Sequence, residues 1–208
     1  CGSIFGQEKN VVNAAIAKMN LFLHGASDFN VMQGDTLRDP KILQGGNIAK
    51  FDCVIANPPF SLENWGATEW SSDKYKRNIY GTPSDSCGDY AWIQHMICSM
   101  SSGKGRMAVV MPQGILFRGN QEAEIRKQLV ESDLIEAVVT LGDKLFYGTG
   151  LSPCFLIIRR MKPAHHSGRI LMIDGSKILT QKRAQNILEE NDIDRLYSLY
   201  QNYSDEED

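Results

Sequence analysis

Short runs rich in Val and Ile alternate along the chain with segments that carry apolar residues at helical spacing, and this alternation constrains the fold most. Residues 11–23 place apolar side chains three and four positions apart, which predicts a helix with one buried face. Further helices are predicted at 89–100 and 120–131. Strands are predicted at 3–7, 30–33, 51–56, 106–111, 134–141, 153–160 and 170–173. This pattern predicts an α/β fold with a mostly parallel sheet covered by helices on both faces.

The connections between these elements refine the expected architecture. No helix separates 134–141 from 153–160, so these two strands are expected to pair as an antiparallel hairpin at one edge of the sheet. The connection over 61–88 exceeds the roughly 15 residues that are usual inside a domain, and connections of that size are commonly functional or disordered. We expect one domain over 1–203 and an acidic, disordered tail over 204–208.

Composition leaves the function open but excludes several classes of protein. The 208 residues are 42% hydrophobic, enough for one core, but the apolar runs are far shorter than the roughly 20 residues of a membrane-spanning helix. No export signal opens the sequence, so a cytoplasmic protein without membrane contact is expected. The 5 cysteines form no C-x-x-C pair, and we expect neither a disulfide framework nor a metal site. A net charge of −3 neither requires nor excludes a nucleic-acid partner.

The sequence Asn57-Pro58-Pro59-Phe60 follows the strand predicted at 51–56 and carries the sharpest chemical signal. In open α/β sheets, ligands bind beyond the carboxyl ends of the strands. Two prolines fix the backbone and remove two N–H donors, so the main chain offers only carbonyl acceptors there. A simple strand-ending turn would also use Asn and Pro, but we favour a rigid acceptor site.

Such a site suits an amino group that is conjugated to an aromatic ring, such as N6 of adenine, whose delocalised lone pair is a poor nucleophile. The Asn57 side-chain oxygen and the Pro58 carbonyl could each accept one N–H, which would localise the lone pair and stabilise the positive charge that develops on nitrogen. Phe60 offers a ring on which a planar base can stack. Because this nitrogen is paired and stacked in duplex DNA, the base would have to be flipped out.

Two acidic residues fall at the ends of other predicted strands. Glu8 and Asp35 precede Asn57 in chain order, so three polar residues are expected along one rim of the sheet. A carboxylate in this position can accept hydrogen bonds from paired ribose hydroxyls or from an adenine amino group. Without Asn57, the simpler interpretations would be preferred, namely a helix N-terminal acid for Glu8 and a turn residue for Asp35.

Further motifs follow one another along nearly the whole chain. They are Gly6-Gln7-Glu8-Lys9-Asn10, Ala17-Lys18-Met19-Asn20-Leu21, Gly34-Asp35-Thr36-Leu37, Asp52 to Phe60, Asp89-Tyr90-Ala91-Trp92, Gly105 to Gly119, Glu124-Ile125-Arg126 and Phe146-Tyr147-Gly148-Thr149-Gly150. In this order they resemble the modification subunit of type I restriction-modification systems, the adenine-specific DNA methyltransferases that use S-adenosylmethionine.

The resemblance implies a Rossmann-like class I methyltransferase sheet and a role for each site residue. Glu8 would bind the ribose of S-adenosylmethionine, and Asp35 with Thr36 would bind its adenine. The segment Asn57–Phe60 would hold the target base, with Asn57 also in contact with the cofactor. The implied partners are double-stranded DNA, a specificity subunit and a restriction subunit.

One element of that family has no counterpart in the chain. Such enzymes carry a glycine-rich loop of the type D-P-x-C-G-S-G after their first strand, close to the methionine part of the cofactor. Cys1-Gly2-Ser3 is followed by a predicted strand rather than by a loop and a helix. We therefore expect the C-terminal two-thirds of the catalytic domain, a partial sheet that by itself is inactive and binds S-adenosylmethionine weakly or not at all.

Two other functions stay open, as does the role of 61–88. A methyltransferase of the same fold could act on a protein glutamine or an RNA guanine, and the chain could also be a non-catalytic scaffold for a specificity subunit. In 61–88, aromatic and basic residues alternate, which suits either a flipped base with its phosphates or a surface loop that packs back on the sheet. These residues are Trp65, Trp70, Lys74, Tyr75, Lys76, Arg77 and Tyr80.

Overall fold

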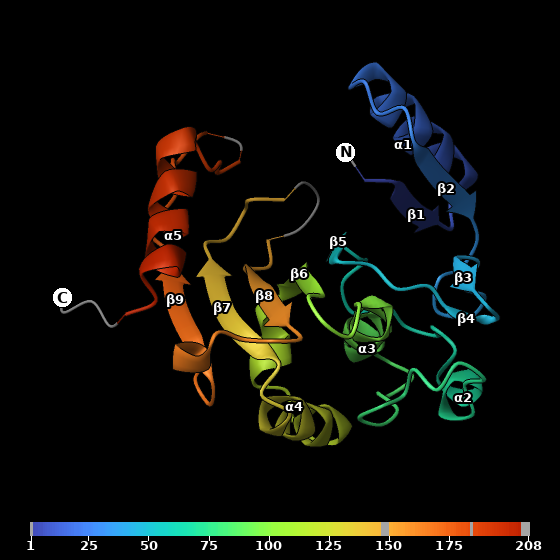
Figure 1. Cartoon of the computed structure of the whole chain (residues 1–208). Helices are drawn as coiled ribbons and strands as arrows, with labels where there is room; N and C mark the ends of the chain where they lie inside the picture. Colours follow the sequence, from blue (N-terminus) through green and yellow to red (C-terminus); the bar gives the residue numbers. More distant parts are fainter. Residues whose placement is uncertain (1, 147–149, 184, 205–208) are drawn as a thin grey trace.

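A five-stranded mixed sheet forms the centre of the fold (Figure 1). The computed structural model describes residues 2–146, 150–183 and 185–204, and the order of strands in this sheet is β5-β6-β8-β7-β9. The strands are β5 (Cys53–Ala56), β6 (Arg106–Pro112), β7 (Ile135–Leu141), β8 (Pro153–Arg159) and β9 (Leu171–Gly175). Four of the five run in one direction, and β8 alone runs in the other. The predicted α/β class with a mostly parallel sheet is confirmed.

The hairpin of β7 and β8 is antiparallel, as predicted, but its predicted place at one edge of the sheet is wrong. β8 lies between β6 and β7 and pairs antiparallel with both. After β8 the chain passes through the short helix η2 (Ala164–His166) and returns as β9, which pairs in parallel with the far side of β7. β9 therefore forms this edge of the sheet, and the hairpin is enclosed on both sides.

Two parallel strands outside this sheet begin the chain. β1 (Ile4–Glu8) pairs with β2 (Phe29–Gln33), and α1 (Val11–Leu23) connects them. Figure 1 shows these elements, in blue, apart from the larger sheet. Among the described residues no strand pairing joins β1 to β5, so the continuous sheet expected from the sequence is divided in two.

Helices cover both faces of the five-stranded sheet. α3 (Asp89–Ser99) and α4 (Gln121–Glu131) pack on one face, and α5 (Glu190–Asn202) packs on the other. Two successive residues of β7 show the alternation, because Val138 joins the core under α3 and α4 whereas Val139 packs in the core beneath α5. The larger core also contains Ile93, Ile97, Val109, Met111, Ile125, Leu129, Leu156 and Ile158.

Several short elements were not predicted from the sequence. A small hairpin pairs β3 (Leu43–Gln44) with β4 (Asn47–Ile48), and α2 (Ala67–Ser71) lies inside the long 61–88 connection. Gly45 and Gly46 form the hairpin turn with φ of +58° and +80°, a left-handed pair that favours glycine. A 3₁₀ helix, η1 (Gln113–Leu116), follows β6.

The sequence also gave expectations about membrane-spanning helices and about the acidic tail. Within the described residues, no helix is long and apolar enough to cross a membrane. The acidic tail expected over 204–208 lies, apart from Ser204, outside the described residues.

Candidate active site

The acceptor loop, as we name Asn57–Phe60, leaves the carboxyl end of β5 at the surface of the molecule. Asn57 and Pro59 are exposed, Pro58 is buried, and Phe60 is half-buried. No hydrogen bond from a described residue engages the Asn57 side chain. Its amide oxygen is therefore available to a donor from outside the chain, while the buried Pro58 anchors the loop to the body.

An aromatic residue from another part of the chain meets the acceptor loop. The rings of Phe60 and Phe146 pack edge to face, with centroids 6.5 Å apart and planes at 78°. Phe146 follows β7 as Phe60 follows β5, and these two strands run in the same direction, so both rings lie at the carboxyl edge of the sheet. Sequence reasoning gave Phe146 no role, although it belongs to a motif noted above; Tyr147, Gly148 and Thr149 of that motif lie outside the described residues.

Glu8 and Asp35 lie side by side at the ends of β1 and β2. The strands are in register with Glu8 opposite Gln33, and the Gly34 N–H donates to the Glu8 carbonyl at 3.0 Å. Lys9 then reaches across to Asp35, with 2.9 Å between Nζ and Oδ2. The structure thus brings together the two carboxylates that the sequence placed at strand ends.

The carboxylates of Asp35 and Glu8 differ in the number of hydrogen bonds and ion pairs that they make within the chain. Asp35 Oδ1 accepts the backbone N–H groups of Leu37 and Arg38, each at 3.1 Å, while Oδ2 pairs with Lys9. Burial alone would raise the pKa of Asp35, but the hydrogen bonds from Lys9, Arg38 and Leu37 and the charge of Lys9 outweigh it, so this pKa is lowered. Asp35 is therefore an anion at neutral pH as well as the turn residue of the simpler interpretation.

Glu8 keeps part of its hydrogen-bonding capacity. Its Oε1 accepts the Asn10 N–H at 2.7 Å, and the Asn10 side chain in turn caps α1. Glu8 Oε2 has no hydrogen bond to a described residue. The half-buried carboxylate is thus held in place through one oxygen, and the other can accept donors from a ligand.

The segment 61–88 packs against the body. Trp65 is 3% exposed, Trp70 2% and Arg77 1%, and both indoles lie in one core cluster with Leu37. For these three residues, the interpretation as a loop that packs back is confirmed, since none of them presents a face for stacking. Lys74 and Lys76 are exposed.

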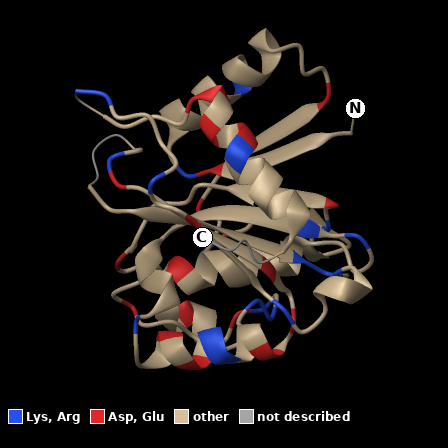
Figure 2. Ribbon diagram, turned by 90° about the vertical axis from the view of Figure 1, so that its left-hand side faces the viewer, with Lys and Arg blue, Asp and Glu red and all other residues tan. Residues whose placement is uncertain are grey.

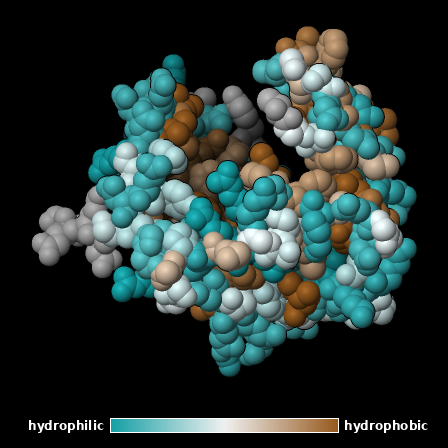
Figure 3. Space-filling model, in the orientation of Figure 1, coloured by the Kyte–Doolittle hydropathy of each residue, from teal (hydrophilic) through white to brown (hydrophobic). Residues whose placement is uncertain are grey.

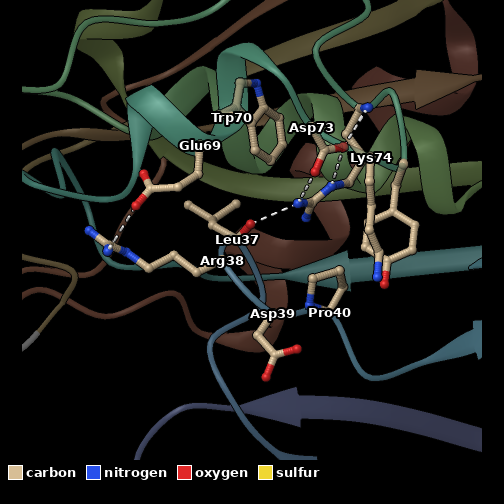
Figure 4. A pocket seen from close by; sticks show the side chains of 10 residues that line it. Leu37, Arg38, Asp39, Pro40, Glu69, Trp70, Asp73 and Lys74 are labelled. Atoms are coloured by element: carbon tan, nitrogen blue, oxygen red, sulfur yellow. Dashed lines mark hydrogen bonds and ion pairs between the residues drawn. The ribbon is translucent and has the colours of Figure 1, made fainter.

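Arg77 ties this segment to the turn that carries Asp35 and Thr36. Its guanidinium donates to the carbonyls of Thr36 and Leu37 at 2.9 and 2.7 Å, and Nη2 lies 2.7 Å from Asp73 Oδ1. Figure 4 shows Leu37 and Asp73 converging in this way. Because 61–88 continues directly from the acceptor loop, Arg77 links the end of β2 to the end of β5.

Two cavities lie near these residues. One, of about 210 Å³, lies between 37–40 and 69–77 and is lined by charges of both signs (Figure 4). The other, of about 560 Å³, lies between β1 and α1, is mostly apolar, and reaches Glu8. Figure 3 shows the molecule hollowed between the α1 end and the rest, with apolar residues in brown at the base of the hollow.

Along the ribbon in Figure 2, the positions of Lys and Arg are interspersed with those of Asp and Glu. No group of three or more His, Cys, Asp or Glu with the geometry of a metal site occurs in the described part of the chain. His166 instead contacts Glu136, with 3.3 Å between Nδ1 and Oε1, and stacks on Tyr203. The acceptor loop and the Glu8–Asp35 pair therefore remain as the chemical features of the carboxyl edge.

Comparison with known proteins gives a consistent result. The sequence model of the N-6 DNA methylase family matches residues 2–208. The MjaVII type I restriction enzyme methylase subunit of Methanocaldococcus jannaschii is 35% identical over 213 residues, which cover 97% of this chain and 36% of that protein. The HindI methylase subunit of Haemophilus influenzae is 33% identical, over 85% of this chain and 38% of that protein. The chain thus spans well under half the length of these relatives.

Solved structures agree. The type I restriction-modification methyltransferase subunit from Streptococcus thermophilus superimposes with a TM-score of 0.89 at 29% identity, over 99% of this chain and 43% of that one. A Listeria monocytogenes protein classed with the class I S-adenosylmethionine-dependent methyltransferases has a TM-score of 0.64 at 14% identity, over 97% of this chain and 55% of that one, and shares the fold alone. The match over residues 2–208 and the likeness to these methylase subunits lead to one conclusion: the chain belongs to the N-6 DNA methylase family.

Proposed function

We propose that this chain is the main part of the catalytic domain of a type I DNA methyltransferase subunit, which transfers a methyl group from S-adenosylmethionine to N6 of a flipped adenine. The observation that carries the proposal is the exposed Asn57 amide, free of described hydrogen-bond partners, next to the edge-to-face pair of Phe60 and Phe146. Membership of the N-6 DNA methylase family supports the same reaction.

The residues at the ends of β1 and β2 fit S-adenosylmethionine. Glu8 Oε2 is available to ribose hydroxyls, and Asp35 and Thr36 lie one strand away, where an adenine amino group would find acceptors. S-adenosylmethionine supplies an electrophilic methyl group on a sulfonium. Because Glu8 is held through Oε1 and Asp35 through its turn, both carboxylates are oriented before the cofactor arrives.

The acceptor loop then prepares the nucleophile. Asn57 Oδ1 and the Pro58 carbonyl each accept one N–H of the target amino group, which draws the lone pair out of the ring. They also stabilise the positive charge that would form on nitrogen as the new N–C bond is made and the bond between sulfur and methyl breaks, before the nitrogen releases one proton to water. Phe60 and Phe146 hold the base by stacking and edge contact, which offsets the few kcal/mol that base flipping costs. No covalent intermediate with the protein is needed.

We further propose that a strand outside this chain completes the sheet between β1 and β5. Each of these strands has an edge without a described strand partner, and the Phe5 and Phe51 rings, near the start of each, lie 5.4 Å apart by centroid. Exposed apolar residues flank the gap, with Ile55 of β5 at 78% exposure and Phe5 of β1 at 45%. A strand followed by a glycine-rich loop would cover them and bring the loop close to Glu8 and Asn57.

The likeness to type I methylase subunits also suggests the setting. We propose that the complete protein acts on double-stranded DNA in the cytoplasm with a specificity subunit that reads the sequence and a restriction subunit. The near-neutral surface of this chain supports a division of labour in which much of the DNA affinity comes from the partners.

The proposed function is tested by Asn57→Ala in the complete subunit, assembled with its specificity subunit. We expect methyl incorporation into duplex DNA to fall by at least roughly 100-fold, because one of two acceptors in the transition state is lost. Binding of S-adenosylmethionine, measured by calorimetry, should stay within about twofold, since Glu8 and Asp35 are untouched. Asn202→Ala, an exposed Asn at the end of α5, is the matched control.

Near-normal methylation by the Asn57→Ala enzyme would refute this role of the acceptor loop. Methyl transfer to protein glutamine or RNA in preference to adenine in DNA would identify a different substrate for the same fold. Retained binding of the specificity subunit together with unchanged modification in cells would instead favour a scaffold.

The completing strand has its own test. The 208-residue chain alone should show no micromolar affinity for S-adenosylmethionine in calorimetry, because it lacks the glycine-rich loop. Micromolar binding by this chain would show that the loop is not needed or has a counterpart among these residues.

A further inference from the structure

We infer that Asp89 is a positioning residue, which fixes the direction in which the acceptor loop presents its oxygens. This inference rests on the proposed function and deepens it. Asp89 is 0% exposed and cannot touch a substrate, so any effect it has on methyl transfer must pass through the residues that it contacts.

The first contact is with the residue that ends the acceptor loop. Ser61 follows Phe60 with a φ of +50°, in the left-handed region that residues other than glycine rarely adopt. Its backbone N–H donates to Asp89 Oδ1 at 2.8 Å. A strained backbone of this kind persists only when its surroundings hold it, and here the buried carboxylate supplies the acceptor that holds the turn.

The base of this support is rigid. Asp89 is the first residue of α3, and the preceding Gly88 donates its N–H to the Leu62 carbonyl at 2.9 Å. A Cβ on Gly88 would lie 2.9 Å from Cγ of Trp65, so only glycine allows this close packing. The start of α3 thus makes hydrogen bonds to two successive residues after the acceptor loop, Ser61 and Leu62.

A second contact couples Asp89 to the next loop along the same edge. Arg118, which follows η1 after β6, pairs through Nη2 with Asp89 Oδ2, and its Nε lies 2.7 Å from Glu122 Oε2. Burial alone would lower the pKa of Arg118, but the hydrogen bonds to Glu122 and Asp89 outweigh it and raise this pKa above its usual value. The ion pair places a cation beside the buried Asp89, whose other oxygen accepts the hydrogen bond from Ser61.

The expected consequence is a loss of rate with little loss of binding. Without the acceptor at Asp89, Ser61 can leave its left-handed conformation and the preceding loop can turn. A displacement of about 1 Å of catalytic groups lowers rates by up to roughly 100-fold even when ligands still bind. Asp89 makes no contact with Glu8, Asp35 or Thr36, so cofactor binding should not change.

The test compares Asp89→Ala, Asp89→Asn and Glu122→Gln in the complete subunit within the assembled enzyme. We expect kcat for DNA methylation to fall roughly 10- to 100-fold in Asp89→Ala, with affinity for S-adenosylmethionine within about twofold. Asn has one side-chain oxygen for three donors, the Ser61 N–H, Arg118 and the Cys87 thiol, and should give an intermediate rate. Glu122→Gln disturbs the same ion-pair network without touching Ser61, so its kcat should stay near that of the wild type whatever its effect on Tm.

The outcomes separate this inference from the proposed function. If Asn57→Ala abolishes transfer in the same assay while Asp89→Ala works at the normal rate, only the inference fails. If kcat follows Tm equally in all three variants, or if even Asp89→Asn fails to fold or bind cofactor, Asp89 is a structural residue and the inference is overturned. If Asn57→Ala itself remains active, the proposed function fails.

Discussion

Phe60 and Phe146 meet edge to face at the carboxyl edge of the sheet, with 6.5 Å between ring centroids, although 85 residues lie between them in the sequence. Phe60 ends the acceptor loop, and Phe146 comes from the segment after β7. Their perpendicular planes form a corner in which a planar base could stack on one ring and meet the edge of the other. Under the proposed function, these two rings would keep the base next to the Asn57 oxygen.

We predict that Phe146→Ala weakens this hold on the base. An edge-to-face aromatic contact is worth about 1 kcal/mol, so kcat/KM for duplex DNA should fall by roughly 5-fold. Phe146→Tyr, which keeps the ring, should behave like the wild type, and Phe146→Leu should resemble Ala. Steady-state methylation with DNA as the varied substrate checks this, and equal activity of the Ala and Tyr variants would show that Phe146 serves only to pack against Phe60.

Cofactor affinity should depend more on Glu8 than on the ion pair beside it. Glu8→Gln removes a charged acceptor for ribose hydroxyls, and hydrogen bonds to charged groups contribute about 1.5–3 kcal/mol, so affinity for S-adenosylmethionine should fall roughly 10- to 100-fold. Lys9→Met is the control, because Lys9 is 74% exposed on its side chain and its pairing with Asp35 contributes at most about 1 kcal/mol. Calorimetry on the complete subunit gives both values. Equal affinities of the Glu8→Gln variant and the wild type would place the ribose elsewhere.

The order of elements followed from local patterns in the sequence. The apolar spacing of 11–23 gives α1 with the predicted bounds, and the strands and the helices α3 and α4 lie within one or two residues of their predicted positions. These features depend on neighbours in sequence, which is why periodicity reveals them. The turn of the β3–β4 hairpin also has a local signal in Gly45-Gly46, since two consecutive glycines favour such a turn.

Features that depend on distant contacts could not be predicted. β8 was paired correctly with β7, but its second partner, β6, comes from a part of the chain more than 40 residues away. The burial of Arg77 depends on a carboxylate at 73, which lies at the local i, i+4 spacing, and on carbonyls at 36 and 37, which no spacing rule connects to position 77. The same reason hid the contacts of Phe146 and Asp89. For the site itself, the sequence indicated the strand ends, while the supports of the acceptor loop required the structure.

Arg77 should contribute strongly to stability. It is 1% exposed, and Arg77→Met would remove the guanidinium that donates to Asp73 and to two backbone carbonyls, leaving Asp73 only backbone N–H donors such as that of residue 77. Removing one partner of a buried ion pair costs about 3–5 kcal/mol. Urea unfolding followed by tryptophan fluorescence should show this loss, because the 3 Trp residues of the chain lie within or next to the affected segment. Lys76→Met, at an exposed neighbour, is the control and should change the free energy of unfolding little. If Arg77→Met lowers the free energy of unfolding by less than about 1 kcal/mol, the result would contradict the structure.

Stability should also fall with acidity through His95, which packs against Arg77 with 3.2 Å between His95 Nδ1 and Nη1 of the guanidinium. Burial, reinforced by the charge of Arg77 and opposed by that of Asp73, lowers the pKa of His95 to about 3, from 6.5. Between about pH 3 and pH 6.5, His95 therefore binds a proton in the unfolded chain but stays neutral in the folded chain. The stabilisation is complete above pH 6.5 and is lost as the pH falls through this window, by at most about 1.4 kcal/mol per pH unit.

The variant that isolates this titration is His95→Gln, whose side-chain oxygen can still accept from Arg77 but cannot take up a proton. We expect urea unfolding between pH 4 and 6 to show a flatter dependence of stability on pH in this variant than in the wild type. His24→Gln, at an exposed histidine, should keep the wild-type slope. Asp73, whose pKa is lowered because hydrogen bonds from Arg77 and its charge outweigh burial, begins to lose its own contribution as the pH approaches its unfolded value of 3.8, but it does so in both proteins and leaves their difference in slope unchanged. If stability depends equally steeply on pH in His95→Gln and in the wild type, His95 is protonated in the folded protein. The assignment of a neutral imidazole next to Arg77 would then be wrong.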